Sequence, residues 1–190
     1  MAGRRLILGT LAAGALLLLP GAALALVSEP PGYRDAPFRS PVPATVLGVP
    51  GIGTELAVRL WQGQAALFID VLPARAGEGV QAGRWLPEKP RQDIPGSLWL
   101  PNTGYPRLDG AMERAFHDRL AALRADPARR DMPLVFYCLT DCWMSWNAAR
   151  RALLWGFSPV LWYPAGTDGW EKAGMPLEDA LPRPETGPPQ

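Results

Sequence analysis

Short apolar runs alternate with amphipathic segments through the middle of the chain, and this alternation restricts the fold to a few architectures. Strand-type runs are expected at 67–71 (LFIDV), 98–100 (LWL), 134–137 (LVFY) and 160–163 (VLWY). The run at 134–137 is apolar throughout, which is typical of a strand covered on both faces. Helices between such strands indicate parallel strands joined by right-handed crossovers. The sequence therefore predicts an α/β domain with a central parallel sheet flanked by helices.

Amphipathic segments before and between these runs predict the helices, at 54–60, 109–125 and 143–155. Asp109 can cap the second of them. One face of that helix carries Met112, Phe116, Leu120 and Leu123. Gly156 can end the third helix, whereas Gly166 and Gly169 predict a loop after the last strand.

Residues 1–25 have the features of a secretory signal peptide. A basic start with Arg4 and Arg5 precedes an apolar stretch over 6–19 and an A-x-A cleavage site that ends at Ala25. The apolar stretch is too short to span a bilayer comfortably. We therefore expect cleavage near Ala25, a periplasmic location and no integral membrane span after cleavage. An uncleaved membrane anchor is the alternative.

The exported part divides by composition into a proline-rich, extended lead-in at 26–53, a domain at 54–175 and a flexible tail at 176–190. Its length of about 165 residues is enough for one domain with a sizeable core. Without Arg4 and Arg5, 17 of the 19 basic residues remain, beside 18 acidic residues in the chain. This near-neutral balance implies neither a nucleic-acid partner nor a polybasic contact with a membrane.

Both cysteines of the chain, Cys138 and Cys142, lie where the strand at 134–137 runs into the next helix. Two cysteines in an exported protein ordinarily form a structural disulfide, but a bridge across so few residues removes little entropy from the unfolded chain. Ligands bind at the carboxyl ends of parallel strands, and a thiol facing a helix N-terminus there is biased toward thiolate. Asp141 disfavours the thiolate if it lies close, or it caps the helix.

Several segments resemble the rhodanese-like family, from residue 67 to residue 170. They are LFIDV (67–71), DIPGSLWLPN (93–102), VFYC (135–138), SWNAARRALLWGF (145–157) and VLWYPAGTDGW (160–170). The resemblance implies a five-stranded parallel sheet with flanking helices. It also makes Cys138 the reactive cysteine of a loop that cradles an anion or a persulfide.

The loop departs from the family pattern at three positions. Asp141 stands in place of a glycine, Trp143 stands in place of an arginine, and Ser145 comes one residue late. An anion bound there would lose a charge-assisted partner and meet a like charge. We therefore expect weak classical thiosulfate sulfurtransferase activity.

The segments CWMSWNAA (142–149) and WYPAGTDGW (162–170) are more similar to a particular group of rhodanese-like proteins. That group is named for a C-x-x-C-W motif and for its association with catabolism dependent on pyrroloquinoline quinone (PQQ). Here three residues separate Cys138 from Cys142, and Trp143 follows. The resemblance implies a periplasmic accessory protein, with a PQQ-dependent dehydrogenase or its electron acceptor as partner and a small thiol or sulfur compound as substrate. No cofactor is firmly implied.

One hypothesis for the loop from Cys138 to Ser145 is a thiol enzyme, either a sulfurtransferase or a thiol-disulfide oxidoreductase. Cys138 would be the nucleophile or persulfide carrier and Cys142 the resolving thiol. This chemistry needs an accessible thiolate, and cysteines four residues apart can reach the separation that a disulfide prefers. His117, the only histidine, is expected on the surface of the helix at 109–125 and outside this chemistry.

Two non-catalytic hypotheses use the same loop. Cys138, Cys142 and Met144 form a soft ligand set that suits copper(I) in a chaperone. Alternatively the cysteines form a disulfide that fixes the loop of a binding module. Its partner surface would then include Trp143 and Trp170, which are expected at loop positions, and Asp168 would be an exposed acid that faces the site. Asp70 is expected to be structural and to tie loops together at the sheet edge.

Overall fold

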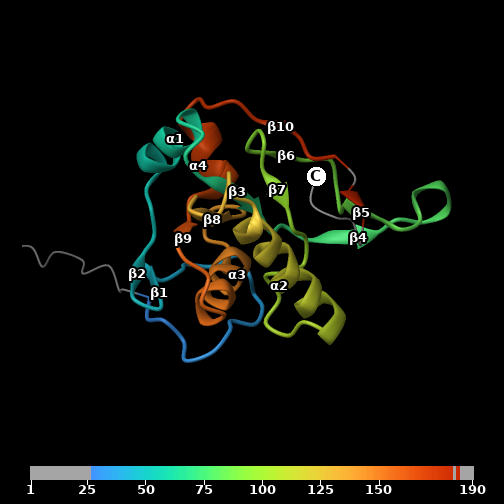
Figure 1. Ribbon diagram of the computed structural model, residues 1–190, viewed down its shortest axis with the longest axis horizontal. Helices are drawn as coiled ribbons and strands as arrows, with labels where there is room; N and C mark the ends of the chain where they lie inside the picture. Colours follow the sequence, from blue (N-terminus) through green and yellow to red (C-terminus); the bar gives the residue numbers. More distant parts are fainter. Residues whose placement is uncertain (1–26, 182, 185–190) are drawn as a thin grey trace, which may run out of the picture.

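A four-stranded parallel sheet in the order β7-β3-β8-β9 forms the centre of the protein (Figure 1). The computed structural model describes residues 27–181 and 183–184, so the predicted signal peptide lies outside the described residues. The strands are β7 (Leu98–Trp99), β3 (Leu67–Asp70), β8 (Leu134–Tyr137) and β9 (Val160–Tyr163). The predicted α/β class and its parallel sheet are confirmed. The resemblance implied five strands, whereas this sheet has four within the described part of the chain.

The strand register brings the carboxyl ends of the three longest strands to one edge of the sheet. Asp70 of β3 is paired with Tyr137 of β8, and Tyr137 with Tyr163 of β9. The segments that leave these strands therefore start side by side. One of them is the cysteine loop.

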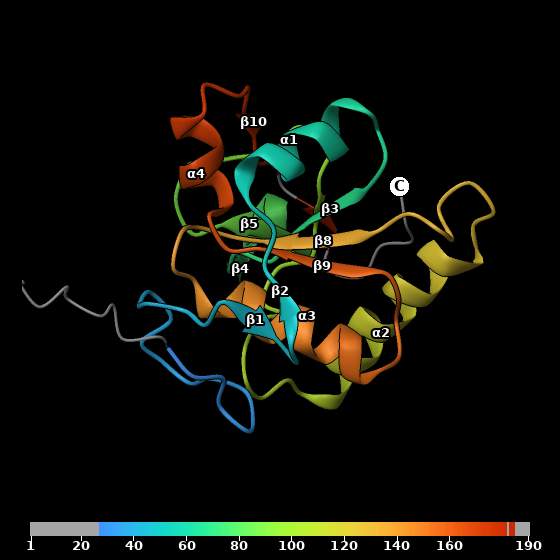
Figure 2. The ribbon, with the colours of Figure 1, turned by 90° about the vertical axis from the view of Figure 1, so that its left-hand side faces the viewer.

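Helices cover both faces of the sheet (Figure 2). On one face lie α1 (Thr54–Gln62) and α4 (Gly166–Lys172), and on the other α2 (Gly110–Ala125) and α3 (Trp143–Leu154). Each face has its own apolar core. The α2/α3 side buries Ile69, Phe116, Leu120, Leu134, Phe136, Trp146 and Trp162, and the α1/α4 side buries Ala57, Phe68, Ile94, Val135, Tyr163 and Trp170.

Side-chain hydrogen bonds fix the starts of two predicted helices. The Asp109 carboxylate accepts hydrogen bonds from the backbone N–H groups of Ala111 and Met112, so it caps α2 as predicted. Thr54 is the first residue of α1 and does not cap it. Its hydroxyl lies 2.9 Å from the Tyr163 hydroxyl and ties the helix start to the end of β9.

The lead-in is extended, but it packs along α3. Asn147 of α3 accepts a hydrogen bond from the Arg34 N–H and donates one to the Arg34 carbonyl, both of 2.9 Å. Downstream, β1 (Thr45–Val46) and β2 (Val49–Pro50) form a hairpin. The expectation of an unpacked segment is wrong here, because α3 carries apolar and small residues on most of its surface and is buried over residues 143–152.

Short strands outside the central sheet tie the C-terminal segment to the domain. A three-stranded antiparallel sheet joins β4 (Ala74–Ala76), β5 (Arg84–Pro87) and β11 (Arg183–Pro184), and a two-stranded one joins β6 (Gln92–Asp93) and β10 (Glu178–Asp179). A single 3-10 turn spans Gly79–Gln81. The described part of 176–190 is thus paired with the domain. Within the described residues, no helix is long and apolar enough to cross a membrane.

Candidate functional site

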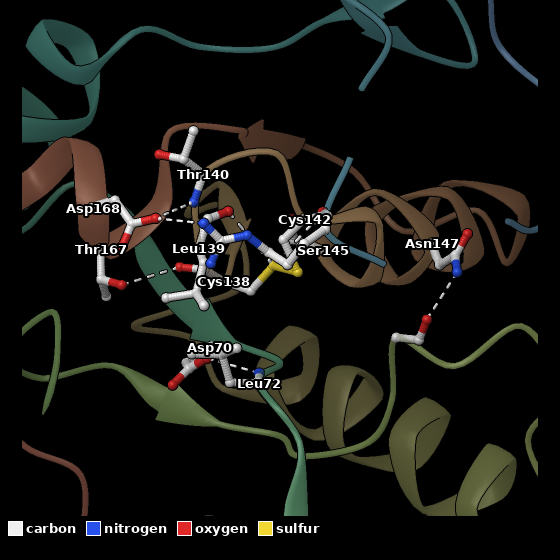
Figure 3. Close-up of a disulfide and its surroundings, with 12 residues drawn as sticks. Asp70, Leu72, Cys138, Leu139, Thr140, Cys142, Ser145, Asn147, Thr167 and Asp168 are labelled. Atoms are coloured by element: carbon white, nitrogen blue, oxygen red, sulfur yellow. Dashed lines mark hydrogen bonds and ion pairs between the residues drawn. A yellow bond between two sulfur atoms is a disulfide. The ribbon is translucent and has the colours of Figure 1, made fainter. Parts of the chain in front are cut away.

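The two cysteines form a disulfide at the junction between β8 and α3 (Figure 3). Cys138 directly follows the last residue of β8, and Cys142 is the N-cap residue of α3. Their Cα atoms are 6.3 Å apart, within the range that disulfides adopt. The predicted position at the carboxyl edge of the sheet and at a helix start is therefore confirmed.

Both sulfur-bearing residues are buried. Cys138 is 0% exposed and Cys142 4% exposed, and both belong to the core on the α2/α3 side. The expectation of an accessible thiol is wrong for this closed, oxidised state. The cysteines are part of the apolar core, and the lead-in lies against Cys142, a contact that strand and helix periodicity could not reveal.

The loop reverses direction at Asp141, which adopts a left-handed backbone conformation with φ of 53°. Its carbonyl accepts a hydrogen bond of 3.0 Å from the N–H of Ser40 in the lead-in. The Asp141 side chain is exposed, and α3 has no side-chain cap. The expectation that Asp141 caps the helix is thus wrong. Aspartate suits this position instead because it tolerates the left-handed conformation better than most residues.

Loop residues 139–141 join the two cysteines and complete the ring that the disulfide closes; we call this segment the roof. Thr140 fixes the roof to the start of α4: its N–H donates to a carboxylate oxygen of Asp168 at 3.0 Å, and its hydroxyl donates to the Ala165 carbonyl at 2.7 Å. The same carboxylate oxygen lies 3.3 Å from the guanidinium of Arg39. Asp168 is a partly exposed acid at the site, as expected, and it joins the roof, α4 and the lead-in.

Arg39 is a site residue that sequence reasoning missed. It forms an isolated antiparallel β-bridge with Cys142, so its backbone runs beside the disulfide. No local signal identifies it, because it lies in the proline-rich lead-in and is far from the loop in sequence. Through its pair with Asp168, Arg39 supplies a cation at the roof from another segment of the chain.

The start of α4 packs directly against the cysteine strand end. Thr167 donates its N–H to the Cys138 carbonyl at 2.9 Å. A β-carbon on Gly166 would lie 2.3 Å from that carbonyl oxygen, and one on Gly169 would lie 2.5 Å from the Ala165 β-carbon. Both glycines were expected to mark a loop, but they belong to α4. Both are required for close packing, and Gly166 also adopts a left-handed backbone conformation with φ of 52°.

The predicted binding tryptophans are buried. Trp143 is 3% exposed and donates its indole N–H to the Ser40 hydroxyl. Trp170 is 0% exposed and lies in α4, where its ring packs edge-on against Trp61 and Phe68. Neither residue forms a solvent-facing surface, so the expectation of a tryptophan-lined partner surface is wrong.

Met144 and Ser145 are also buried, in the first turn of α3. The Ser145 hydroxyl donates to the Cys142 carbonyl at 3.1 Å and accepts the indole N–H of Trp162 at 3.0 Å. In the disulfide form the two cysteine sulfurs are bonded to each other and are not thiolate ligands. The described residues contain no cluster of three or more histidine, cysteine or acidic side chains that could hold a metal.

Asp70 has the structural role expected of it. Its carboxylate accepts the Leu72 N–H at 2.8 Å and forms an ion pair with Arg91. Complete burial raises the pKa of Asp70, and the nearby guanidinium opposes this shift. Arg91 in turn lies over the Trp99 ring, 4.7 Å from its centroid.

Tyr137 occupies the other side of the same sheet edge. Its hydroxyl donates to Ser97 at 2.8 Å and accepts the Ile94 N–H at 3.1 Å. Burial raises the pKa of Tyr137 well above its ordinary value, and the carboxylates of Asp70 and Asp93 add to the shift. His117, by contrast, is half-exposed on α2 and packs against aromatic residues at the far end of α3, so it is a surface residue as predicted.

No protein-family model and no curated protein matches the chain. Similar solved structures include a full-length protein from Lactobacillus plantarum, with 19% identity, a TM-score of 0.45, and coverage of 68% of this chain and 88% of that chain. A thiosulfate sulfurtransferase from Pseudomonas aeruginosa has 24% identity and a TM-score of 0.42. The match covers 68% of this chain and 20% of that chain. A human single-domain sulfurtransferase has 22% identity and a TM-score of 0.41. The match covers 66% of this chain and 97% of that chain.

Proposed function

We propose that this protein is a rhodanese-like thiol protein whose Cys138–Cys142 pair performs sulfur transfer or dithiol-disulfide exchange. The observation that carries the proposal is the disulfide at the joint between the carboxyl end of β8 and the N-cap of α3. A bond that closes so small a ring contributes only about 2 kcal/mol through chain entropy. Stability alone is therefore a weak reason for this chain to place its two cysteines there.

The reduced pair would supply a nucleophile and a resolving thiol. In sulfur transfer, the Cys138 thiolate attacks the outer sulfur of a donor such as thiosulfate, and sulfite leaves with the electron pair of the broken S–S bond. The Cys142 thiolate then attacks Cys138 Sγ of the persulfide, which restores the disulfide and releases hydrosulfide. In dithiol exchange, the pair instead passes two electrons and two protons to a partner disulfide.

The electrostatics of the loop favour a thiolate at Cys142 and disfavour thiosulfate as donor. A thiolate at the N-cap of α3 would be stabilised by the positive end of the helix dipole. Thiosulfate carries two negative charges and would meet Asp141 and Asp168 at the roof, with Arg39 already paired to Asp168. We propose that the physiological substrate is a small thiol or a less charged sulfur compound.

The resemblance at 142–149 and 162–170 supports a role in PQQ-dependent alcohol catabolism. The N-terminal segment with its A-x-A site supports export to the periplasm. In that setting the partner would be a PQQ-dependent dehydrogenase or its electron acceptor. Location, pathway and partner are proposals drawn from the sequence.

A second candidate is a non-catalytic binding module, and the burial of both cysteines favours it. In this case the disulfide fixes the loop and never cycles. A copper(I) chaperone is a variant of the same idea that requires both thiols to be reduced, with Met144 as the third ligand.

One experiment separates these functions. The oxidised protein is equilibrated with redox buffers, and each cysteine is alkylated and identified by mass. A reduction potential between about −270 and −120 mV supports exchange or sulfur transfer, and the cysteine that is alkylated first identifies the nucleophile. A potential below about −300 mV without turnover of any thiol or sulfur donor supports the binding module. Copper that co-purifies with the reduced protein supports the chaperone.

A further inference from the structure

The roof is the most exposed part of the ring that the disulfide closes. Both cysteines are buried, whereas Asp141 in the roof is exposed and Leu139 and Thr140 are half-buried. Thiol-disulfide exchange requires direct approach of a thiolate to one sulfur. Exchange in the folded protein therefore requires a local movement that exposes a sulfur, and the roof, which joins the two cysteines, is the nearest exposed segment.

The start of α4, to which the roof is bonded, is closely packed. Gly166 and Gly169 of α4 lie so close to their neighbours that a single β-carbon would overlap them. Thr167 adds a hydrogen bond from α4 to the Cys138 carbonyl. Because α4 packs closely against the end of β8, an interaction between α4 and the roof ties the roof to this packed element.

Asp168 provides the charged interaction between these two parts. One oxygen of its carboxylate accepts the Thr140 N–H and also forms an ion pair with the Arg39 guanidinium. The side chains of Arg39 and Asp168 are 54% and 44% exposed, so the pair is open to solvent and can separate at low cost. A hydrogen bond to an ionised acceptor is stronger than one between neutral groups.

We propose that Asp168 is a positioning residue that holds the roof closed over the Cys138–Cys142 disulfide, and that Arg39 orients its carboxylate. A partner thiol reaches the sulfurs when Thr140 is released from Asp168 and from the Ala165 carbonyl, through local opening of the loop rather than through unfolding of the domain. This inference deepens the proposed function and rests on it for biological meaning. Its test, however, does not depend on any enzymatic activity.

The test is the rate at which dithiothreitol reduces the disulfide in the full chain. The disulfide gains two electrons and two protons, and dithiothreitol is oxidised to its cyclic disulfide. Free thiols are quantified by alkylation and mass. Asp168→Asn should raise the rate about fivefold, because a partly exposed charge-assisted contact is lost. Glu171→Gln removes an exposed acid from the same helix and should leave the rate unchanged.

Arg39→Gln gives a second variant that leaves Asp168 in place. It should raise the rate less than Asp168→Asn does, and the double variant should be no faster than Asp168→Asn alone, because Arg39 acts through Asp168. Equal rates for the wild type and both single variants would overturn the proposal.

The dependence of the rate on urea separates local opening from a general loss of stability. Well below the unfolding transition, the faster rate of Asp168→Asn should be nearly independent of urea, since little surface is exposed when a loop opens. A rate that rises with urea as steeply as global unfolding would assign Asp168 a purely structural role and would also overturn the proposal. Absence of turnover with thiol and sulfur substrates would instead count against the proposed function alone.

Discussion

Gly166 lies against the carbonyl oxygen of Cys138 with no room for a side chain between them. An added β-carbon would lie 2.3 Å from that oxygen, and Gly166 has a φ of 52°. We predict that Gly166→Ala lowers the free energy of unfolding by about 2 to 4 kcal/mol, through steric overlap and a left-handed backbone. Urea denaturation of the purified variant measures this.

The matched control for that variant is Gly174→Ala. Gly174 also has a positive φ, of 71°, but a β-carbon added to it would have no atom within 4 Å. This variant should lose only about 1 kcal/mol, from the backbone conformation alone. Equal losses for the two variants would show that α4 can move away from the Cys138 carbonyl.

Reduction of the Cys138–Cys142 bond should leave the domain folded. The bond closes a short ring, so its loss should lower the free energy of unfolding by about 2 kcal/mol. Urea denaturation of the oxidised protein and of the protein held reduced gives the difference. Unfolding of the reduced protein under native conditions would identify the disulfide as a structural staple and favour the binding module.

Arg91→Met should be among the most destabilising single substitutions of a charged residue. It leaves the fully buried Asp70 carboxylate without its cationic partner, which costs about 3 to 5 kcal/mol. Arg59→Met is the control, because the Arg59–Glu55 pair is exposed and should contribute less than about 1 kcal/mol. Chemical denaturation at pH 7 compares the two. Similar small losses would mean that water solvates Asp70 in the variant.

Tyr137 should make the protein less stable in alkali. Its pKa is raised in the folded state by burial, so above pH 10 the unfolded chain loses the phenolic proton while the folded chain keeps it. The free energy of unfolding therefore falls as pH rises above 10, and Tyr137 contributes up to about 1.4 kcal/mol per pH unit. Denaturation curves between pH 9 and 11 measure the slope.

Tyr137→Phe tests that assignment. The variant should lose about 1 to 3 kcal/mol at pH 7, because the Ile94 N–H and the Ser97 hydroxyl lose their partner. Above pH 10 its stability should fall less steeply than that of the wild type. Parallel slopes would show that the alkaline effect comes from another group.

The sequence alone predicted the layered architecture, because the relevant signals are local. Four apolar runs coincide with β3, β7, β8 and β9, and Asp109 caps α2 where its side chain predicts a helix start. The junction between β8 and α3 also followed from periodicity alone. That is why the sequence was sufficient to place Cys138 and Cys142 at the carboxyl edge of the sheet.

Glycine and tryptophan were misleading where tertiary packing outweighed local preference. Gly166 and Gly169 weaken a helix by propensity, yet α4 contains both, because a β-carbon would overlap the Cys138 carbonyl at Gly166 and the Ala165 side chain at Gly169. Trp170 consequently lies inside a helix and within the core, where a loop position had been expected.

The state of the cysteines was decided by the tertiary structure. Residues of the lead-in, far away in sequence, lie across the N-terminus of α3, and the register of β8 and β9 brings Asp168 to Thr140. Hydrophobic periodicity records which face of an element is buried, but not which distant segment covers it. For that reason the sequence determined where the two sulfurs lie in the fold, and only the packing of the whole chain determined that they are buried and that Arg39 and Asp168 meet at the loop between them.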